Sequence, residues 1–219
     1  EKYQDVLILS HPKPIESLLD KIMLDLLILE NAHDRLRTSS YCPKFVEGLK
    51  IEEFILGPSK LGVTFHPMKS QAYEPTSANL VTVEVVIKNK ICMDLSNFDY
   101  ANKKLWMFHD VIYSIEFIKA LSVYQQLEDC SKRALIASAL ACSNFKAAFY
   151  SYTHYSDRTY YPDGGTMSWS KEIQAQAPGS TRMHTGIIAA IREAKLDVRE
   201  YTLLKMIIVL NPRKLEAMN

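Results

Sequence analysis

The residue types that could carry out catalysis or bind metal are dispersed along the 219-residue chain. Metal ligands on one helix often stand four residues apart, so that both side chains face the same ion. None of the six histidines stands at that spacing from another histidine, a cysteine or a carboxylate: they are His11, His33, His66, His109, His154 and His184. The chain is therefore predicted to hold no metal or other cofactor.

The cysteines also lack the close pairs that zinc ribbons and zinc fingers require. We interpret them as reduced, mostly buried thiols. They are Cys42, Cys92, Cys130 and Cys142.

Signals of catalysis are equally weak. His154 lies close in sequence to Ser156 and Asp157, the residue types of a hydrolase triad, but the chain has no nucleophile elbow. Gly164 and Gly165 indicate a turn rather than a phosphate loop, because no glycine-rich run leads from a strand into a lysine-bearing helix. We therefore expect a protein that is not an enzyme.

Composition and charge are those of one globular domain or two small ones, with 47% hydrophobic and 23% charged residues. The net charge of +1 comes from 26 basic and 25 acidic residues and predicts no strong attraction to nucleic acid or an anionic membrane. The chain has no apolar run long enough for a membrane span and no secretory leader pattern, which indicates an intracellular protein. Because the first residue is Glu1 rather than Met, we expect a fragment with a further domain upstream.

The basic residue Lys119 lies near the end of the first of two apolar segments in the middle of the chain, and these segments determine its position. From residue 97 to residue 121, apolar side chains recur every three or four positions, which predicts a long helix. A turn-like segment follows at residues 122–130. Residues 131–152 then carry almost no charge beyond their first turn, which predicts a second helix surrounded by protein. The recurring positions of the first helix are Leu105, Phe108, Ile112, Ile115 and Ile118.

The order of residues across this break resembles the signature of nuclear hormone receptor ligand-binding domains. It runs Phe117-Ile118-Lys119, then Tyr124, Leu127, Ser131-Lys132 and Leu135-Ile136. Tyr124 departs from the Phe or Leu that the family prefers. The resemblance implies an all-α fold over residues 1–219, a layered antiparallel helical sandwich with a small β-hairpin. It points to the nematode-type (supplementary) receptors, with the C-terminal helices of the fold lacking.

In the N-terminal half, a first helix is predicted from about residue 15 to residue 38, with Glu30 and other charged residues largely outside. We interpret residues 44–95 as a mobile connection. Within it, the β-branched residues at 80–87 favour a strand, whereas the family places a variable helix or a loop there. The expected apolar face of the first helix is Leu18, Ile22, Leu26 and Leu29.

In the C-terminal half, a β-hairpin is predicted around the aromatic and turn residues 160–165. Two further helices are predicted at about 181–194 and 197–210. The second of them should begin with a capping box, because Asp197 stands at the N-cap and Glu200 three residues later.

The resemblance implies a coregulator groove beside Lys119. In the family, a lysine at this point of the third helix caps the carboxyl end of a docked coactivator helix, a cation against the negative end of a helix dipole. The simpler alternative is a solvated lysine that stabilises only its own helix. Asp129 falls where receptors often have an apolar groove residue, and the lacking last helix supplies the opposing carboxylate, so weak coactivator binding is expected. The groove residues are Ile112, Ile115, Lys119, Lys132, Arg133 and Ile136.

The resemblance also implies a ligand pocket between the third and fifth helices, the hairpin and the helix near residue 187. Steroid-type receptors pair an acid on the third helix with an arginine on the fifth. Asp110 matches the acid, but Ser151 stands in the arginine's place, so this clamp is expected to be missing. The alternative is a solid core filled by the same side chains. The pocket candidates are Trp106, Met107, Asp110, Ser114, Ala141, Phe145, Ala148, Phe149, Tyr160, His184, Ile187 and Ile188.

The function implied by the resemblance is regulation of transcription in the nucleus. A lipophilic ligand would bias where the closing helix rests, and so bias the docking of coactivator or corepressor peptides. DNA binding would come from a zinc-finger domain that this chain does not contain, and a second receptor is an implied dimer partner. The alternative is a ligand-less, receptor-like module that serves only protein interaction or dimerisation.

Overall fold

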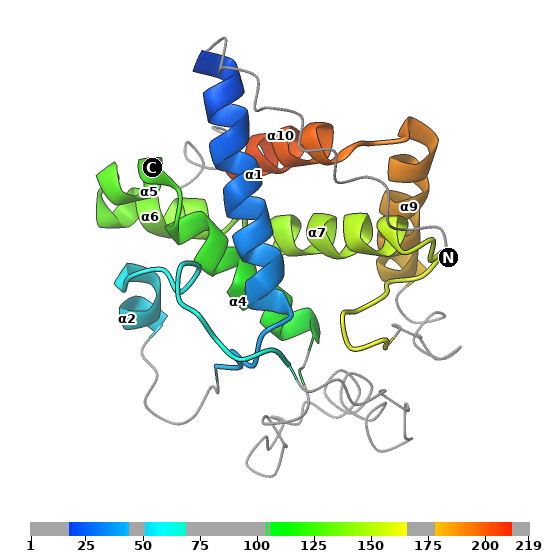
Figure 1. Cartoon of the computed structure of the whole chain (residues 1–219), viewed down its shortest axis with the longest axis horizontal. Coiled ribbons are helices and arrows are strands. Elements are labelled where there is room, and N and C mark those ends of the chain that lie inside the picture. Colours follow the sequence, from blue (N-terminus) through cyan, green and yellow to red (C-terminus); the bar gives the residue numbers. More distant parts are fainter. Residues whose placement is uncertain (1–17, 44–50, 69–103, 105, 166–177, 212–219) are drawn as a thin grey trace, which may run out of the picture.

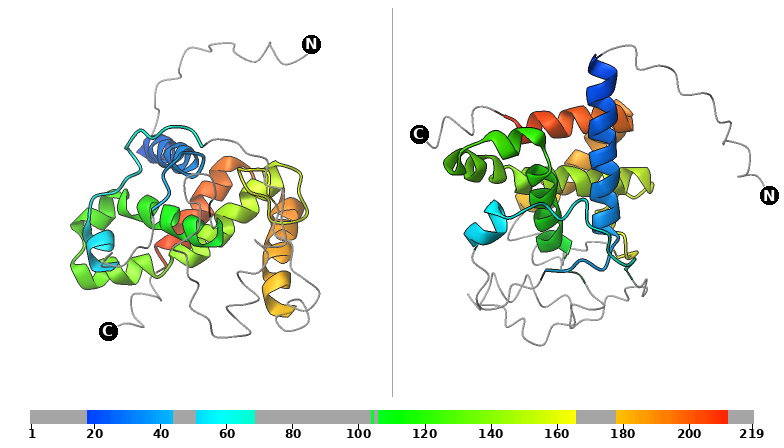
Figure 2. Two further views of the ribbon diagram at one scale, coloured as in Figure 1. Left: turned by 90° about the horizontal axis from the view of Figure 1, so that it is seen from below. Right: turned by 60° about the vertical axis from the view of Figure 1, so that its left-hand side comes forward.

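The computed structural model describes residues 18–43, 51–68, 104, 106–165 and 178–211, which form a stack of helices (Figure 1, Figure 2). The predicted all-α fold is confirmed for these residues, whose β structure consists of isolated bridges such as that between Ser39 and Pro67. Their helices are α1 (Leu18–Arg37), α2 (Ile51–Leu56), α4 (Trp106–Lys119), α5 (Ser122–Gln126), α6 (Asp129–Ile136), α7 (Ala139–Thr153), α9 (Pro178–Ala194) and α10 (Val198–Val209).

Helix α7 lies in the middle of the stack and packs against α4, α9 and α10. Helix α1 lies across α4 and α10 as a further layer, as the two turned views in Figure 2 show. The small helix α2 packs against α6, at the end of the molecule where α4 finishes. The sequence of α7, whose single charged residue is Lys146, is explained by this position, because a helix with neighbours on three sides has little surface to solvate.

The segment at residues 131–152 is interrupted, so the prediction of one continuous helix there is wrong. Helix α6 ends at Ile136 and α7 begins at Ala139. Between them Ser138 donates its hydroxyl to the carbonyl of Leu135 at 2.6 Å, a local bond that competes with the regular helical ladder. The preceding segment was predicted as a turn but holds the short helix α5.

Helix α1 is buried along the predicted face only in its second half, where Leu29 packs against the main core cluster. Leu18 and Ile22 are 74% and 45% exposed, because the first turns of α1 extend beyond the other labelled helices (Figure 1). The buried residues lie in its second half and include charged and polar side chains: Glu30, Ala32, His33, Leu36 and Arg37. The expectation that Glu30 lies outside is therefore wrong.

The turn at residues 161–165 is formed as predicted. The amide of Tyr161 donates to the carbonyl of Gly165 at 2.9 Å. Gly164 has a φ of +85°, a conformation that glycine adopts without a steric penalty. The second strand of the predicted hairpin, like the predicted strand at 80–87, lies outside the described residues.

Helices α9 and α10 confirm the predicted C-terminal elements, and the capping box is present. The side chain of Asp197 accepts hydrogen bonds from the amides of Arg199 and Glu200, at 2.7 and 2.8 Å. The carboxylate of Glu200 accepts in return from the amide of Asp197 at 3.0 Å. The start of α10 is thus fixed by its own sequence.

Candidate functional site

Lys119 is the last residue of α4 and faces α2. Its ammonium donates to the carbonyl of Phe54 at 2.8 Å and forms an ion pair with Glu116 at 3.3 Å. The ammonium also lies 4.7 Å from the centre of the Phe54 ring. The side chain is only 2% exposed, so the alternative of a solvated lysine does not describe this structure. Burial lowers the pKa of Lys119, and the Glu116 carboxylate offsets part of that shift.

Glu116 fastens the segment that follows α2 to the same end of α4. Its carboxylate accepts from the amide of Lys60 at 2.7 Å and from the hydroxyl of Tyr41 at 3.3 Å. Its backbone carbonyl accepts from the hydroxyl of Ser59 at 2.6 Å. Sequence reasoning missed this residue, although its position one helical turn before Lys119 is the spacing at which opposite charges pair.

The other predicted groove residues, on α4 and α6, are buried to different degrees. Ile112 and Ile115 are buried in the main core cluster, which also contains Leu61 from the segment after α2. On α6, Lys132 is partly exposed and pairs with Asp129 at 3.4 Å. Also on α6, Arg133 is exposed and Ile136 is half-buried. The ends of α4 and α6 therefore form one surface, and α2 lies on it.

Asp110, in the first half of α4, pairs with an arginine that sequence reasoning did not assign to it. Arg37 of α1 donates through Nε and Nη2 to the two carboxylate oxygens, at 2.7 and 2.9 Å. The arginine comes from the first helix, whereas the fifth-helix position of the steroid-type clamp holds Ser151. Burial alone would lower the pKa of Arg37, but the carboxylate outweighs it and raises the pKa.

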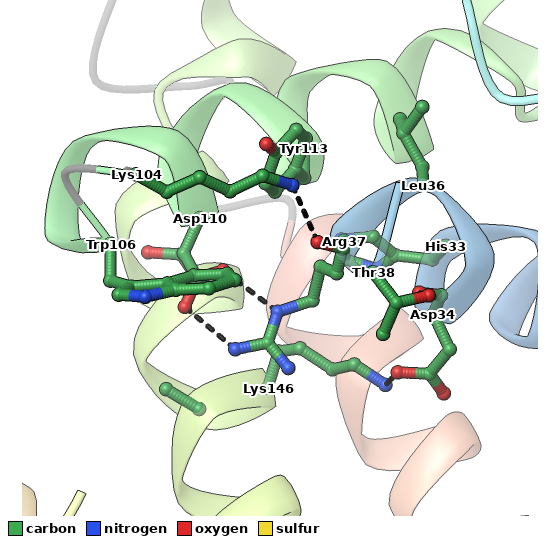
Figure 3. A network of polar contacts seen from close by, with 12 residues as sticks. His33, Asp34, Leu36, Arg37, Thr38, Lys104, Trp106, Asp110, Tyr113 and Lys146 are labelled. Atoms are coloured by element: carbon green, nitrogen blue, oxygen red, sulfur yellow. Dashed lines mark hydrogen bonds and ion pairs between the residues drawn. The ribbon is translucent and has the colours of Figure 1, made fainter. Parts of the chain in front are cut away.

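The Arg37 side chain is enclosed by aromatic rings and by the end of its own helix (Figure 3). Its guanidinium carbon lies 5.7 Å from the centre of the Trp106 ring and 4.9 Å from that of Tyr150, within the range of cation–π attraction. Lys104 caps α1, donating to the carbonyls of Arg37 and Ser39 at 2.7 and 2.6 Å. Burial lowers the pKa of Lys104 to about 8.

Of the predicted pocket residues on α4, Trp106 packs against the turn at 161–165. The Trp106 ring stacks on Tyr161 with centroids 5.4 Å apart, and its indole nitrogen donates to Asp163 at 2.5 Å. Ser114 is fully buried and its hydroxyl has no hydrogen-bond partner among the described residues. The side chain of Met107 lies outside the described part.

The pocket residues predicted on α7 and α9 form a second packed cluster with α10. Phe149 stacks on Tyr201 with centroids 3.9 Å apart, and Phe145 contacts the same ring. Ile188 and Ala148 are 1% and 3% exposed within it. Ile187 is partly buried against this cluster. Ala141 and Tyr160 are half-buried, and the side chain of His184 lies outside the described residues.

Glu30 of α1 joins three helices through buried ion pairs. Its two carboxylate oxygens accept from Lys146 of α7 at 2.5 Å and from Lys205 of α10 at 2.6 Å. Lys146 also pairs with Asp34 at 2.7 Å. Burial would raise the pKa of Glu30, but the two lysines hold it well below its ordinary value. The signal that was available in the sequence is a lysine within a mostly apolar stretch of each partner helix, Lys146 in α7 and Lys205 in the second half of α10.

His33 completes this cluster as a neutral ring. Its Nδ1 lies 2.8 Å from the ammonium of Lys205, a distance at which the ring nitrogen accepts a hydrogen bond. Burial and the neighbouring lysine lower the pKa of His33 well below its ordinary value. The imidazole therefore serves as an acceptor for a buried cation.

The described residues show few further features of a binding site. It contains no group of three or more His, Cys, Asp or Glu side chains that could hold a metal ion. None of its helices is long and apolar enough to cross a membrane. A recess of about 250 Å³ does occur, between the end of α1 and residues 61–65 and away from the predicted pocket. Among the described cysteines Cys142 is buried and Cys130 exposed, and none forms a disulfide.

Comparison with known proteins supports a relationship to the nuclear hormone receptors. Over 180 aligned residues, 78% of this chain, it is 28% identical to the nuclear hormone receptor family member nhr-1 of Caenorhabditis elegans. The aligned part is 39% of that relative, so the chain spans less than half of its length. No family model matches the chain, and no solved structure matches it. A distant receptor relative and an all-α fold thus agree with the resemblance carried by the signature around Lys119.

Proposed function

We propose that the chain is the ligand-binding domain of a nuclear hormone receptor, which regulates transcription by binding a lipophilic ligand and coregulator proteins. The observation that carries the proposal is the contact of Lys119 with the carbonyl of Phe54 at 2.8 Å. A cation at the end of α4 meets the carboxyl end of a short helix there, which is the chemistry expected of a groove that docks coregulator helices. The distant receptor relative supports the same conclusion.

The proposal includes the location and partners of such a receptor. The domain would act in the nucleus, with DNA contacted by a zinc-finger domain elsewhere in the protein. A net charge of +1 gives this chain no strong overall attraction to DNA. A second receptor is the expected dimer partner.

A lipophilic ligand would enter between α4, α7 and α9, where the candidate residues are mostly apolar. Ala141 and Leu140 provide a matched pair of test positions on α7, because the first is half-buried and the second is 60% exposed. Phenylalanine at position 141 should fill the pocket, whereas phenylalanine at position 140 should leave it open.

A thermal-shift screen against a lipid library tests the ligand. A compound at one hundred times its Kd stabilises the folded state by about 2.7 kcal/mol, which corresponds to roughly 5–10 °C for a chain of this size. The wild type and Leu140→Phe should show the rise, and Ala141→Phe should not. If no compound moves the melting temperature of the wild type, the ligand-binding function is wrong.

The second candidate function is a ligand-less module for protein interaction or dimerisation. The close stacking of Phe149 on Tyr201, and the 1% exposure of Ile188 beside them, favour a filled core. This alternative predicts no stabilisation by any lipid, but retained binding of a protein or peptide at the α4–α6 surface.

A further inference from the structure

Helix α2 carries the sequence pattern of the peptides that the proposed coregulator surface would bind. Its residues 51–55 read Ile-Glu-Glu-Phe-Ile, with apolar side chains at the first, fourth and fifth positions. That spacing is the same as in an LxxLL peptide, and it places the three apolar side chains on one helical face. Glu52, which falls between them, is exposed.

The carboxyl end of α2 is held by two side-chain donors. Lys119 donates to the carbonyl of Phe54 at 2.8 Å, and the hydroxyl of Tyr124 donates to the carbonyl of Ile55 at 3.0 Å. The last carbonyls of any helix have no partners within the helix. These two donors from outside α2 therefore bind it end-on, in addition to its apolar contacts.

Two apolar side chains of α2, those of Phe54 and Ile55, face the molecule. Ile55 is 9% exposed, and Phe54 is partly buried against the main core cluster, while the neighbouring Leu56 is 41% exposed. Helix α2 packs against α6, so it spans the surface between α6 and the end of α4 (Figure 1). Its orientation, with one apolar edge inward and its carboxyl end on a lysine, is that of a docked peptide.

We propose that α2 is an intramolecular occupant of the coregulator surface, which an incoming helix of the same Φ-x-x-Φ-Φ spacing must displace. The proposal rests on the proposed function, because that function assigns the surface to coregulators. Ser59 and Lys60 bind Glu116 a few residues after α2, so the tether is short. A short tether gives α2 an effective concentration of about 1 mM, so a free peptide at about 1 μM competes poorly.

The experiment uses the whole chain and a labelled peptide with the sequence of residues 49–60. Ile55→Asn removes the buried apolar anchor and places an amide where it cannot reach water. Leu56→Asn makes the same chemical change on the exposed side of α2 and is the control. Fluorescence anisotropy should show the peptide binding at least about tenfold more tightly to Ile55→Asn than to the wild type or the control.

A second variant tests the end-on contact. Adding Tyr124→Phe to Ile55→Asn removes the donor to the carbonyl of residue 55 and should weaken the peptide about two- to tenfold. Circular dichroism confirms that each variant keeps the helical fold. If Ile55→Asn is folded and binds the peptide no better than the wild type, the inference is overturned.

If Ile55→Asn does not fold, amide hydrogen exchange of a different variant tests the inference. Tyr124→Phe alone should speed the exchange of residues 51–56 severalfold while α7 stays protected, and unchanged exchange overturns the inference.

A peptide with the LxxLL motif separates this inference from the proposed function. Should it bind the wild type and Ile55→Asn equally, coregulator docking stands and occupancy by α2 is wrong. Should only the peptide from residues 49–60 bind, occupancy by α2 stands and coregulator docking is wrong.

Discussion

Replacing Glu30 with alanine tests how much the buried ion cluster stabilises the fold. The change leaves Lys205, whose side chain is 0% exposed, with the neutral His33 ring in place of a carboxylate. Lys146 keeps Asp34 at 2.7 Å. Removing one partner of a buried ion pair costs about 3–5 kcal/mol. Since one of the two lysines keeps a carboxylate, we expect a loss near the lower end, about 3 kcal/mol.

Urea denaturation followed by circular dichroism at pH 7 measures the loss as a change in the free energy of unfolding. For a chain of this length, about 3 kcal/mol lowers the melting temperature by roughly 6–12 °C. Asp157→Ala is the control, because it also removes a carboxylate, here from a surface pair with Arg192 at 2.7 Å in which Asp157 is 87% exposed. An exposed pair of this kind contributes less than about 1 kcal/mol.

A double variant shows that the penalty arises from the unpaired charge. Glu30→Ala combined with Lys205→Met removes both partners, and should recover part of the lost stability because no ammonium is left buried without a carboxylate. A loss below about 1 kcal/mol for Glu30→Ala would refute the reasoning. The reasoning would also be refuted if the double variant lost more free energy of unfolding than the two single variants lose together.

Three further predictions concern the same helices. Burial lowers the pKa of His33 below the ordinary value of 6.5 for histidine. Below pH 6.5 the imidazole therefore takes up a proton in the unfolded chain but not in the folded chain. Stability should therefore fall on acidification by about 1.4 kcal/mol per pH unit, and urea titrations at pH 7, 6 and 5 should show this slope flattened in His33→Gln. Asp110→Ala leaves the buried Arg37 unpaired and should lose about 3 kcal/mol in the same assay. Asp197→Ala removes the cap of α10 and should cost about 1 kcal/mol, measured by thermal melting.

The helices that were predictable from sequence are those whose ends or faces are decided locally. Asp197 and Glu200 start α10 through bonds within four residues of one another, so their spacing is sufficient to predict the cap. The apolar positions of α9 also predict its buried face, where Ile188 and Ile191 are 1% and 4% exposed.

The buried charges could not be placed because their partners lie far away in sequence. Lys205 and Glu30 are separated by 175 positions, and Asp110 and Arg37 by 73. A periodicity argument assigns a charged residue to the solvent side by default. That default failed for Glu30, since two lysines compensate its burial and neither is a neighbour on its helix.

The sequence indicated that Lys119 lies at the end of a helix, but not that α2 lies against it. The signature placed Lys119 at a helix end where it can bind a carbonyl, and it does so. The covering helix could not be foreseen, because residues 44–95 have no clear periodicity and α2 is only six residues long. A helix this short is marginal in isolation and is stabilised by what it packs on.

Lys205 and Lys119 differ in what would follow if their partners left. Lys205 binds the charged carboxylate of Glu30, so separating them would leave the buried ammonium of Lys205 without a carboxylate. Lys119 binds the neutral carbonyl of Phe54 and also pairs with Glu116 of its own helix at 3.3 Å. Departure of α2 therefore creates no isolated charge, and a second helix can offer Lys119 the same kind of carbonyl. The charge cluster around Glu30 is suited to hold α1, α7 and α10 together permanently, whereas the contact at Lys119 is suited to exchange.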